Sequence, residues 1–175
     1  FTVMDIKEVN KLNRAEFVHY FRNVVNNNPL CAAVVWQQRP FSDVKQMHRC
    51  FEVFLDSLSV IGKLGVFCLS PDLGCKELFN NSLSKDSANE QTNAGLKDLT
   101  EEERRRMENL NVQYLQKFGF PFIKAVRKSN RLEILEALEK RIHNSRPIEI
   151  ENALQEVKKY SWYRLQERMN YKSKL

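Results

Sequence analysis

Apolar residues recur every three or four positions along most of the chain, which is the period of an α-helix that buries one face. Capping residues stand where these segments begin. Asn13 precedes Glu16, and Thr100 precedes Glu103, at the spacing of a capping box. Gly119 is placed to end the long helix that follows Thr100. Few alternating β-branched runs and only 5 Gly and 5 Pro argue against a β-sandwich or barrel, so the sequence predicts an all-α fold.

This pattern predicts a single domain over residues 4–172, a multi-helix bundle of roughly seven to nine helices. Neither an internal repeat nor a linker divides the chain. The expected helices include apolar segments within residues 13–25, 30–36, 42–55, 100–118, 130–143 and 147–165. Ser87 and Glu90 also have capping-box spacing and would begin a further helix. Residues 57–86 are rich in glycine, proline and serine, so we expect a long ordered loop there.

The net charge of +6 favours anionic partners in general. No zinc-finger or ribonucleoprotein-type motif accompanies it, so we interpret it as a solvated surface and expect no nucleic-acid partner. No apolar run approaches the roughly 18 residues of a membrane span, so no membrane association is expected. Cys31, Cys50, Cys68 and Cys75 form no CxxC pair. A metal site beside the last two would need more ligands at suitable spacing, so we expect free thiols and no metal.

The last three residues, Ser173-Lys174-Leu175, have the sequence of a peroxisomal targeting signal, at the position where the import receptor reads it. The alternative is a coincidence, or a terminus that is modified. We therefore expect residues 173–175 to be a targeting tail, the import receptor to be a partner, and the protein to be peroxisomal.

Three motifs stand together in this sequence: Ser70-Pro71-Asp72-Leu73, Glu90-Gln91 and Phe118-Gly119-Phe120-Pro121-Phe122. In combination they resemble the family of decarboxylases that act on 2-oxo-4-hydroxy-4-carboxy-5-ureidoimidazoline (OHCU). The resemblance runs from Met4 to about Arg164. It implies a homodimeric carboxy-lyase of purine metabolism that converts OHCU to (S)-allantoin during urate degradation. No cofactor is implied, because the imine and carbonyl of the substrate ring can accept the electron pair left by the departing carboxylate.

The resemblance also implies a site for a small anionic substrate. Ser70 stands where the family has its catalytic His, and Glu90 matches an essential acidic residue. Arg164 matches a C-terminal arginine, whose planar guanidinium suits an anion. Backbone groups of residues 122–126 are implied to bind the substrate. The full implied substrate-binding set is Pro71, Ser87, Ala88, Asn89, Glu90, Gln91, Phe122, Ile123, Lys124, Ala125, Val126 and Arg164.

Several of these residues also have an ordinary structural interpretation. By spacing alone, Glu90 would cap a helix by reaching back to Ser87. Arg164 would be a surface arginine on a basic helix, and Pro71 a loop corner of fixed backbone angle. Lys124 lies where the family has a more apolar stretch, and could either point to solvent or change the charge of the pocket.

Ser70 is a departure from the family that bears on catalysis. A serine hydroxyl is a poor general acid near neutral pH, whereas imidazole titrates close to it. Loss of a general acid typically lowers a rate by roughly a hundred- to ten-thousandfold, so we expect weak or absent activity. The alternative is a ligand-binding pseudoenzyme that keeps the pocket without turnover. A third interpretation is an all-α scaffold that binds acidic partners through its basic surface.

Overall fold

The computed structural model describes residues 3–74, 76–79 and 82–169. It confirms the all-α prediction: these residues form nine helices of six or more residues and one single-turn helix, and their only β-type pairing is an isolated bridge between Met4 and Met169. The elements are α1 (Ile6–Lys11), α2 (Arg14–Phe21), α3 (Pro29–Trp36), α4 (Val44–Ser57), α5 (Val60–Phe67), α6 (Lys76–Phe79), α7 (Lys85–Asn93), a 3-10 turn η1 (Leu96–Asp98), α8 (Glu101–Phe118), α9 (Arg131–Arg141) and α10 (Arg146–Arg168). None of the described helices is both long and apolar enough to cross a membrane.

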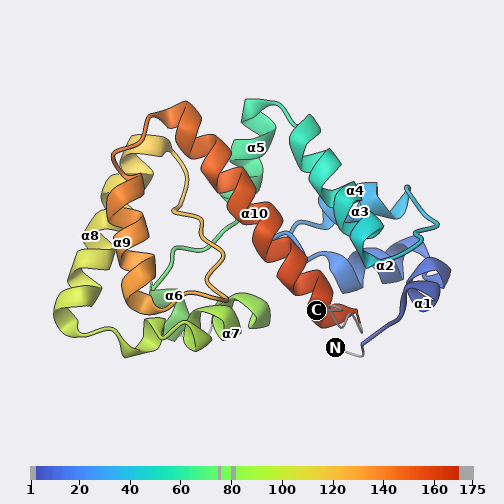
Figure 1. The fold of residues 1–175 in the computed structure, drawn as a ribbon, viewed down its shortest axis with the longest axis horizontal. Coiled ribbons are helices and arrows are strands. Elements are labelled where there is room, and N and C mark those ends of the chain that lie inside the picture. The colour runs from blue at the N-terminus through green and yellow to red at the C-terminus, as the bar shows by residue number, and fades with distance from the viewer. Residues whose placement is uncertain (1–2, 75, 80–81, 170–175) are drawn as a thin grey trace.

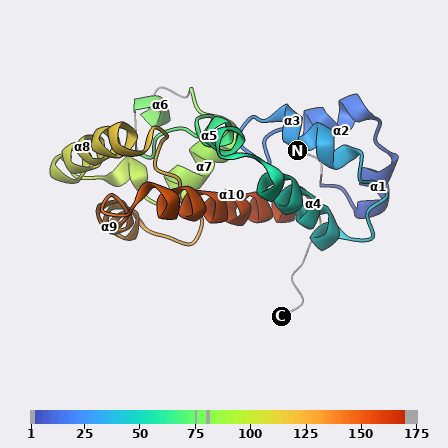
Figure 2. The same cartoon turned by 90° about the horizontal axis from the view of Figure 1, so that it is seen from above.

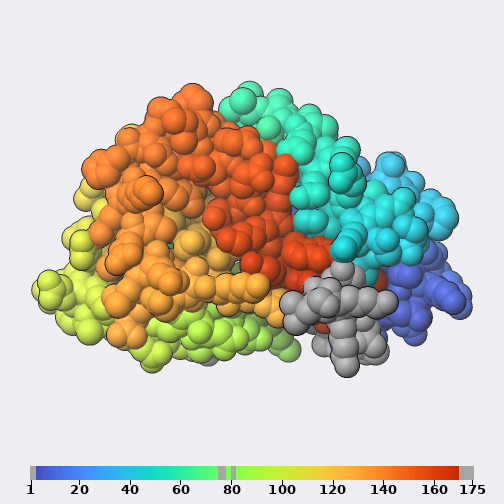
Figure 3. Space-filling view, in the orientation of Figure 1, coloured from blue at the N-terminus to red at the C-terminus, as the bar shows by residue number. Residues whose placement is uncertain are grey.

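Helix α10 runs between two groups of helices (Figure 1). Helices α1–α4 lie towards one end of the molecule, and α8 and α9 lie at the other; a view from above shows the same division (Figure 2). Helix α10 packs against α4, α5 and α8. One of its faces forms part of the molecular surface between the two ends (Figure 3). Helix α10 also contacts α7, through the Arg164–Glu90 and Arg168–Asp86 ion pairs.

Local capping signals explain where several helices begin and end. The Asn13–Glu16 and Thr100–Glu103 capping boxes are both present, as predicted. Gly119 ends α8 with φ of 79°, a left-handed conformation that costs glycine least. Pro147 lies in the first turn of α10, where its missing amide hydrogen costs no helical hydrogen bond.

The prediction of one long loop over residues 57–86 was wrong, because α5 and α6 lie within it. The hydroxyl of Ser59 caps α5 by accepting a hydrogen bond from the amide of Gly62. Burial of Val66 and Phe67 offsets the low helix propensity of the glycines. Tertiary packing therefore overrides the glycines that had indicated a loop.

The predicted start of the next helix was also misplaced. The N-cap of α7 is Ser84, whose hydroxyl accepts a hydrogen bond from the amide of Ser87 at 3.3 Å. Glu90 lies inside the helix, so it does not form a capping box with Ser87. This shift of three residues frees the Glu90 carboxylate for a contact with α10.

Candidate active site

Most of the predicted site residues line one small cavity between α7, α10, the segment that follows α5 and the segment that follows α8. Its volume is about 30 Å³, roughly the space that one water molecule occupies in the liquid. A second cavity of about 440 Å³ adjoins it and shares Asn26, Ser70, Pro71 and Ser87. The residues that line the smaller cavity are Asn26, Ser70, Pro71, Leu73, Ser87, Glu90, Gln91, Phe122, Ile123, Lys124, Val126, Tyr160 and Arg164.

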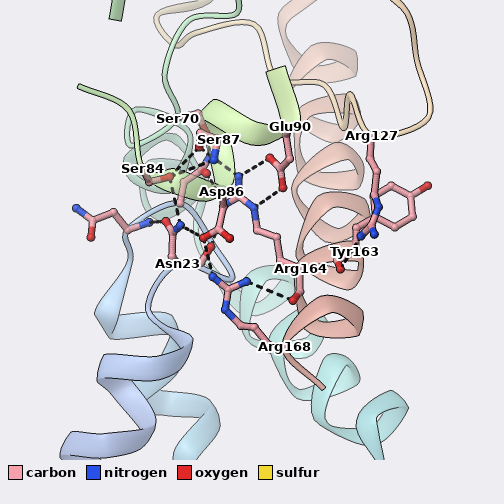
Figure 4. A network of polar contacts seen from close by, with 12 residues as sticks. Asn23, Ser70, Ser84, Asp86, Ser87, Glu90, Arg127, Tyr163, Arg164 and Arg168 are labelled. Atoms are coloured by element: carbon pink, nitrogen blue, oxygen red, sulfur yellow. Dashed lines mark hydrogen bonds and ion pairs between the residues drawn. The ribbon is translucent and has the colours of Figure 1, made fainter. Parts of the chain in front are cut away.

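Arg164 is buried in this cavity wall, with 2% of its surface exposed. Its guanidinium binds the Glu90 carboxylate through two parallel hydrogen bonds, each 2.7 Å long (Figure 4). The side-chain oxygen of Asn26 accepts a third at 2.7 Å, and the backbone oxygen of Asn23 a fourth at 2.9 Å. Burial lowers the pKa of Arg164, but the hydrogen bonds and charge of Glu90 outweigh that effect and raise it. Arg164 is therefore a fixed, permanently charged group and not a surface arginine.

A second ion pair lies one helical turn away from the first. Arg168 binds the Asp86 carboxylate at 2.6 Å, as Arg164 binds Glu90 (Figure 4). Residues four apart on a helix share one face, so the two pairs join one face of α7 to one face of α10. The side chain of Asn23 also binds Asp86. These contacts fix the position of Glu90 relative to Arg164.

Ser70 is buried at the meeting point of the two cavities. Its hydroxyl oxygen accepts a hydrogen bond of 2.8 Å from the side-chain amide of Asn26, which in turn accepts one from Arg164. The hydroxyl of Tyr160 lies close to Ser70. It has no hydrogen-bond partner within bonding geometry among the described residues. Burial raises the pKa of Tyr160 above its ordinary value, against lowering effects of Arg164 and Ser70, so the phenol is protonated at neutral pH.

The side chain of Gln91 binds the loop that carries the Ser70-Pro71-Asp72-Leu73 motif, and its nitrogen has no partner among the described residues. Its side-chain oxygen accepts a hydrogen bond of 2.9 Å from the amide of Gly74, which fixes which end of the carboxamide is the oxygen. The side-chain nitrogen, Nε2, is buried and has no partner among the described residues. Two buried side-chain donors of this cavity, on Gln91 and Tyr160, are thus unsatisfied, which is unusual in a native protein unless a ligand or water binds there.

The segment after α8 is held by its backbone. Arg141 donates to the oxygen of Ile123 at 2.7 Å, and the amide of Ala125 donates to Glu156 at 2.7 Å. Within the described residues, the amides of Ile123, Lys124 and Val126 donate no hydrogen bond. These three residues, whose amides have no acceptor in the described part of the chain, all line the cavity.

The sequence matches the family model described as OHCU decarboxylase over residues 10–166. The chain belongs to the OHCU decarboxylase family. The mouse protein named 2-oxo-4-hydroxy-4-carboxy-5-ureidoimidazoline decarboxylase is 41% identical to it over 162 residues, which cover 93% of this chain and 91% of that one. The resemblance that the motifs indicated is therefore confirmed at the level of the family.

Two crystal structures share the fold. An OHCU decarboxylase solved in the presence of (S)-allantoin matches with a TM-score of 0.71 at 21% identity, covering 87% of this chain and 99% of that chain. A structure titled (S)-allantoin synthase matches with a TM-score of 0.77 at 23% identity, covering 95% of this chain and 54% of that chain. At these identities they show that the OHCU decarboxylase fold is present, and no more than the fold.

The structure brings together ten of the residues implied by the family resemblance: Ser70, Pro71, Ser87, Glu90, Gln91, Phe122, Ile123, Lys124, Val126 and Arg164. Ala88, Asn89 and Ala125 do not line the cavity. Each residue of a helix turns by about 100°, so Ala88 and Asn89 leave the face that carries Ser87 and Gln91. The amide of Ala125 is already bound to Glu156. The roles of all these residues in binding and catalysis stay predictions.

Sequence reasoning missed Asn26, Leu73 and Tyr160, which also line the cavity. Tyr160 could have been found from its position four residues before Arg164, which places both on one face of a helix. Asn26 lies in an irregular stretch after α2, and no local pattern places it beside α10.

The cysteines and histidines give no sign of a metal site in the described part of the chain. Cys31, Cys50 and Cys68 are free thiols there, and no three His, Cys, Asp or Glu side chains among those residues gather closely enough to hold a metal ion. Cys75, which the sequence analysis considered as a ligand, lies outside the described residues. A larger hollow of about 720 Å³ between α4 and α10 contains none of the predicted site residues.

Proposed function

We propose that this protein decarboxylates OHCU to (S)-allantoin, without a cofactor, as a carboxy-lyase of urate degradation. The observation that carries the proposal is the set of unsatisfied buried donors around one cavity, in a chain of the OHCU decarboxylase family. OHCU offers carbonyl, hydroxyl and carboxylate oxygens that can accept from such donors. A donor that is buried without a partner favours a ligand that satisfies it, because an unmade hydrogen bond costs about 1–3 kcal/mol.

The charges of the cavity suit an anion. The opposite charges of Arg164 and Glu90 offset each other. Lys124 lines the same cavity and forms no ion pair among the described residues, so it adds a positive charge. All five donor positions of the guanidinium are directed at protein acceptors, of which the Ser87 hydroxyl is the most distant, at 3.3 Å. We expect a substrate oxygen to displace this weakest contact first.

The arrangement supports decarboxylation by orientation and charge. The scissile carbon–carbon bond breaks as carbon dioxide leaves, and its electron pair passes to the imine and carbonyl of the ring. Free amides of residues 123, 124 and 126 and the Gln91 side chain would bind the polar arms of the substrate. Glu90, held in place by Arg164, would accept a hydrogen bond from a hydroxyl or ureido group. We expect OHCU to enter through the 440 Å³ cavity, which adjoins the inner one. The inner cavity is too small for OHCU and must widen to admit it.

Ser70 means that imidazole is not the acid of this protein. We therefore expect turnover that is slower than in a Ser70→His variant, by up to the hundred- to ten-thousandfold that a general acid contributes. A second candidate is a ligand-binding pseudoenzyme. It is favoured by the small size of the inner cavity and by the saturation of Arg164 with protein acceptors.

The proposal extends to location and assembly. Ser173-Lys174-Leu175 would direct the protein to the peroxisome through the import receptor. These residues lie outside the described part of the chain. We also propose a homodimer, as the family resemblance implies.

The experiment mixes the full chain with freshly generated OHCU and follows its disappearance against buffer alone. The wild-type protein should exceed buffer, and Ser70→His should be faster. Ser57→His is the matched control, because it makes the same substitution at an exposed serine that lines neither cavity, and its rate should equal wild type. Rates equal to buffer for both wild type and Ser70→His would reject decarboxylation. A melting temperature raised by (S)-allantoin in a protein without turnover would instead support the pseudoenzyme.

A further inference from the structure

The cavity contains a side chain that the family resemblance did not imply. Tyr160 projects from the same face of α10 as Arg164 and lines the inner cavity. It is 5% exposed, and the guanidinium carbon of Arg164 lies 4.6 Å from the centre of its ring. Its hydroxyl is near the Ser70 side chain and has no hydrogen-bond partner among the described residues. A buried phenol without a partner is destabilising, so its presence calls for a reason.

We propose that Tyr160 is the proton donor of the reaction, in the place that imidazole fills elsewhere in the family. The inference rests on the proposed decarboxylation of OHCU. Loss of carbon dioxide leaves an electron pair on the ring system. The carbon that carried the carboxylate becomes a ring carbonyl as its hydroxyl proton passes to the imine nitrogen, and the neighbouring carbon that bears the ureido group must gain a proton on one face. The Tyr160 O–H bond breaks as the new C–H bond forms, which leaves a phenolate and completes allantoin.

The surroundings of Tyr160 suit this step. Burial keeps the phenol protonated at neutral pH, yet the carbanion-like carbon is a much stronger base than a phenolate and can take the proton. The nearby guanidinium of Arg164 stabilises the negative charge that forms on Tyr160. A neutral side chain beside a fixed guanidinium thus replaces a cationic donor.

Ser70 then has a defined task. It lines both the inner cavity and the 440 Å³ cavity, and Asn26 holds its oxygen by donating to it, so the Ser70 hydrogen is free to point at Tyr160. Water in the outer cavity can pass a proton to Ser70 as Ser70 passes its own to the phenolate. This transfer restores the Tyr160 phenol and consumes one solvent proton per turnover, which balances the reaction.

Two other donors in the cavity are less well placed. Ser70 alone is a weaker acid than a phenol, and its oxygen is already engaged by Asn26. Lys124 is only half-buried and forms no contact that orients its ammonium group among the described residues. Both enter the test as variants.

The test measures kcat and KM for OHCU in Tyr160→Phe and Tyr163→Phe. Both substitutions remove one hydroxyl from α10, but Tyr163 does not line the cavity. We expect Tyr160→Phe to lower kcat by about a hundredfold with little change in KM, as loss of a general acid does. Tyr163→Phe should match wild type. The melting temperature of Tyr160→Phe should be equal to or above that of wild type, because the hydroxyl it removes has no partner.

A rescue experiment separates proton donation from substrate binding. The double variant Ser70→His with Tyr160→Phe should recover the rate of Ser70→His, because imidazole then supplies the proton.

An unchanged kcat in Tyr160→Phe would overturn the proposal, as would a rise in KM alone or a failed rescue. A loss of kcat confined to Lys124→Met would overturn it as well. An inactive wild-type protein together with an active Ser70→His variant would also overturn the proposal for Tyr160. It would not overturn the proposal that this fold supports decarboxylation. Inactivity of both would reject the proposed function itself.

Discussion

Arg164 and Glu90 act on stability as well as on the proposed chemistry. The arginine is fully surrounded, whereas the Glu90 side chain keeps 17% of its surface exposed. A buried ion pair is a weak source of net stability, but removing one partner leaves the other charge uncompensated. We therefore interpret the ion pair as a contact that fixes the positions of the Glu90 carboxylate and the Arg164 guanidinium.

Replacing Arg164 with methionine should lower the free energy of unfolding by about 3 kcal/mol, towards the lower end of the range for a broken buried pair because Glu90 is partly exposed. Urea denaturation measures this change. The double variant Arg164→Met with Glu90→Leu should recover most of the loss, since no charge is then left alone. Arg105→Met, on the exposed face of α8, should cost less than about 0.5 kcal/mol. Equal losses at Arg164 and Arg105 would refute the pairing.

At the scale of elements, the segment after α8 is positioned by α9 and α10 and not by its own secondary structure. Arg141 and Glu156 each bind one backbone group of residues 123–125, which leaves the neighbouring amides free for a ligand. The aromatic rings of Phe118 and Phe120 anchor the start of the segment in the core. The role that we propose for this segment in substrate binding therefore depends on both kinds of contact.

Glu156→Leu should therefore raise KM for OHCU by about tenfold and change kcat little, because the free amides shift while the groups proposed for chemistry stay in place. Steady-state kinetics on freshly generated OHCU gives both parameters. Glu151→Leu is the control, since Glu151 is exposed on the same helix and its one side-chain hydrogen bond among the described residues is with Gln155. A fall in kcat at constant KM would show that Glu156 does not act through this segment.

At the scale of the whole molecule, α10 joins the two ends through buried polar contacts. Glu149 near its start is fully buried and binds Tyr114 of α8 and Arg141 of α9. His48 of α4 binds the backbone oxygen of Lys158 at 3.0 Å. A carbonyl only accepts, so the Nε2 of His48 carries the hydrogen. The position of α10 thus depends on both ends of the molecule.

This arrangement predicts a loss of stability in mild acid. Burial lowers the pKa of His48, against the raising effects of the Lys158 backbone oxygen and the Glu52 charge. As the pH falls, His48 is therefore protonated at a higher pH in the unfolded chain than in the folded protein. The free energy of unfolding should be constant above about pH 7 and fall below about pH 6.5, by at most about 1.4 kcal/mol per pH unit from this group. His48→Gln should flatten the slope seen by urea denaturation at several pH values, whereas exposed His143→Gln should not. An identical slope in both would contradict this assignment.

Sequence reasoning succeeded where the signal is local and failed where packing decides. The caps at Asn13 and Thr100 and the end at Gly119 depend on neighbours within one turn, so the sequence specifies them directly. Helix α5 was missed because the burial that stabilises it comes from distant residues. The contact of Asn26 with Ser70 spans segments with no common pattern, so only the tertiary structure could reveal it.

The most direct test of the account is the optical activity of allantoin formed from freshly generated OHCU by the full chain. A proton delivered by a fixed group such as Tyr160 reaches one face of the ring carbon only. We predict circular dichroism of an excess of (S)-allantoin, formed faster than in buffer. Racemic allantoin that forms at the buffer rate would contradict the account.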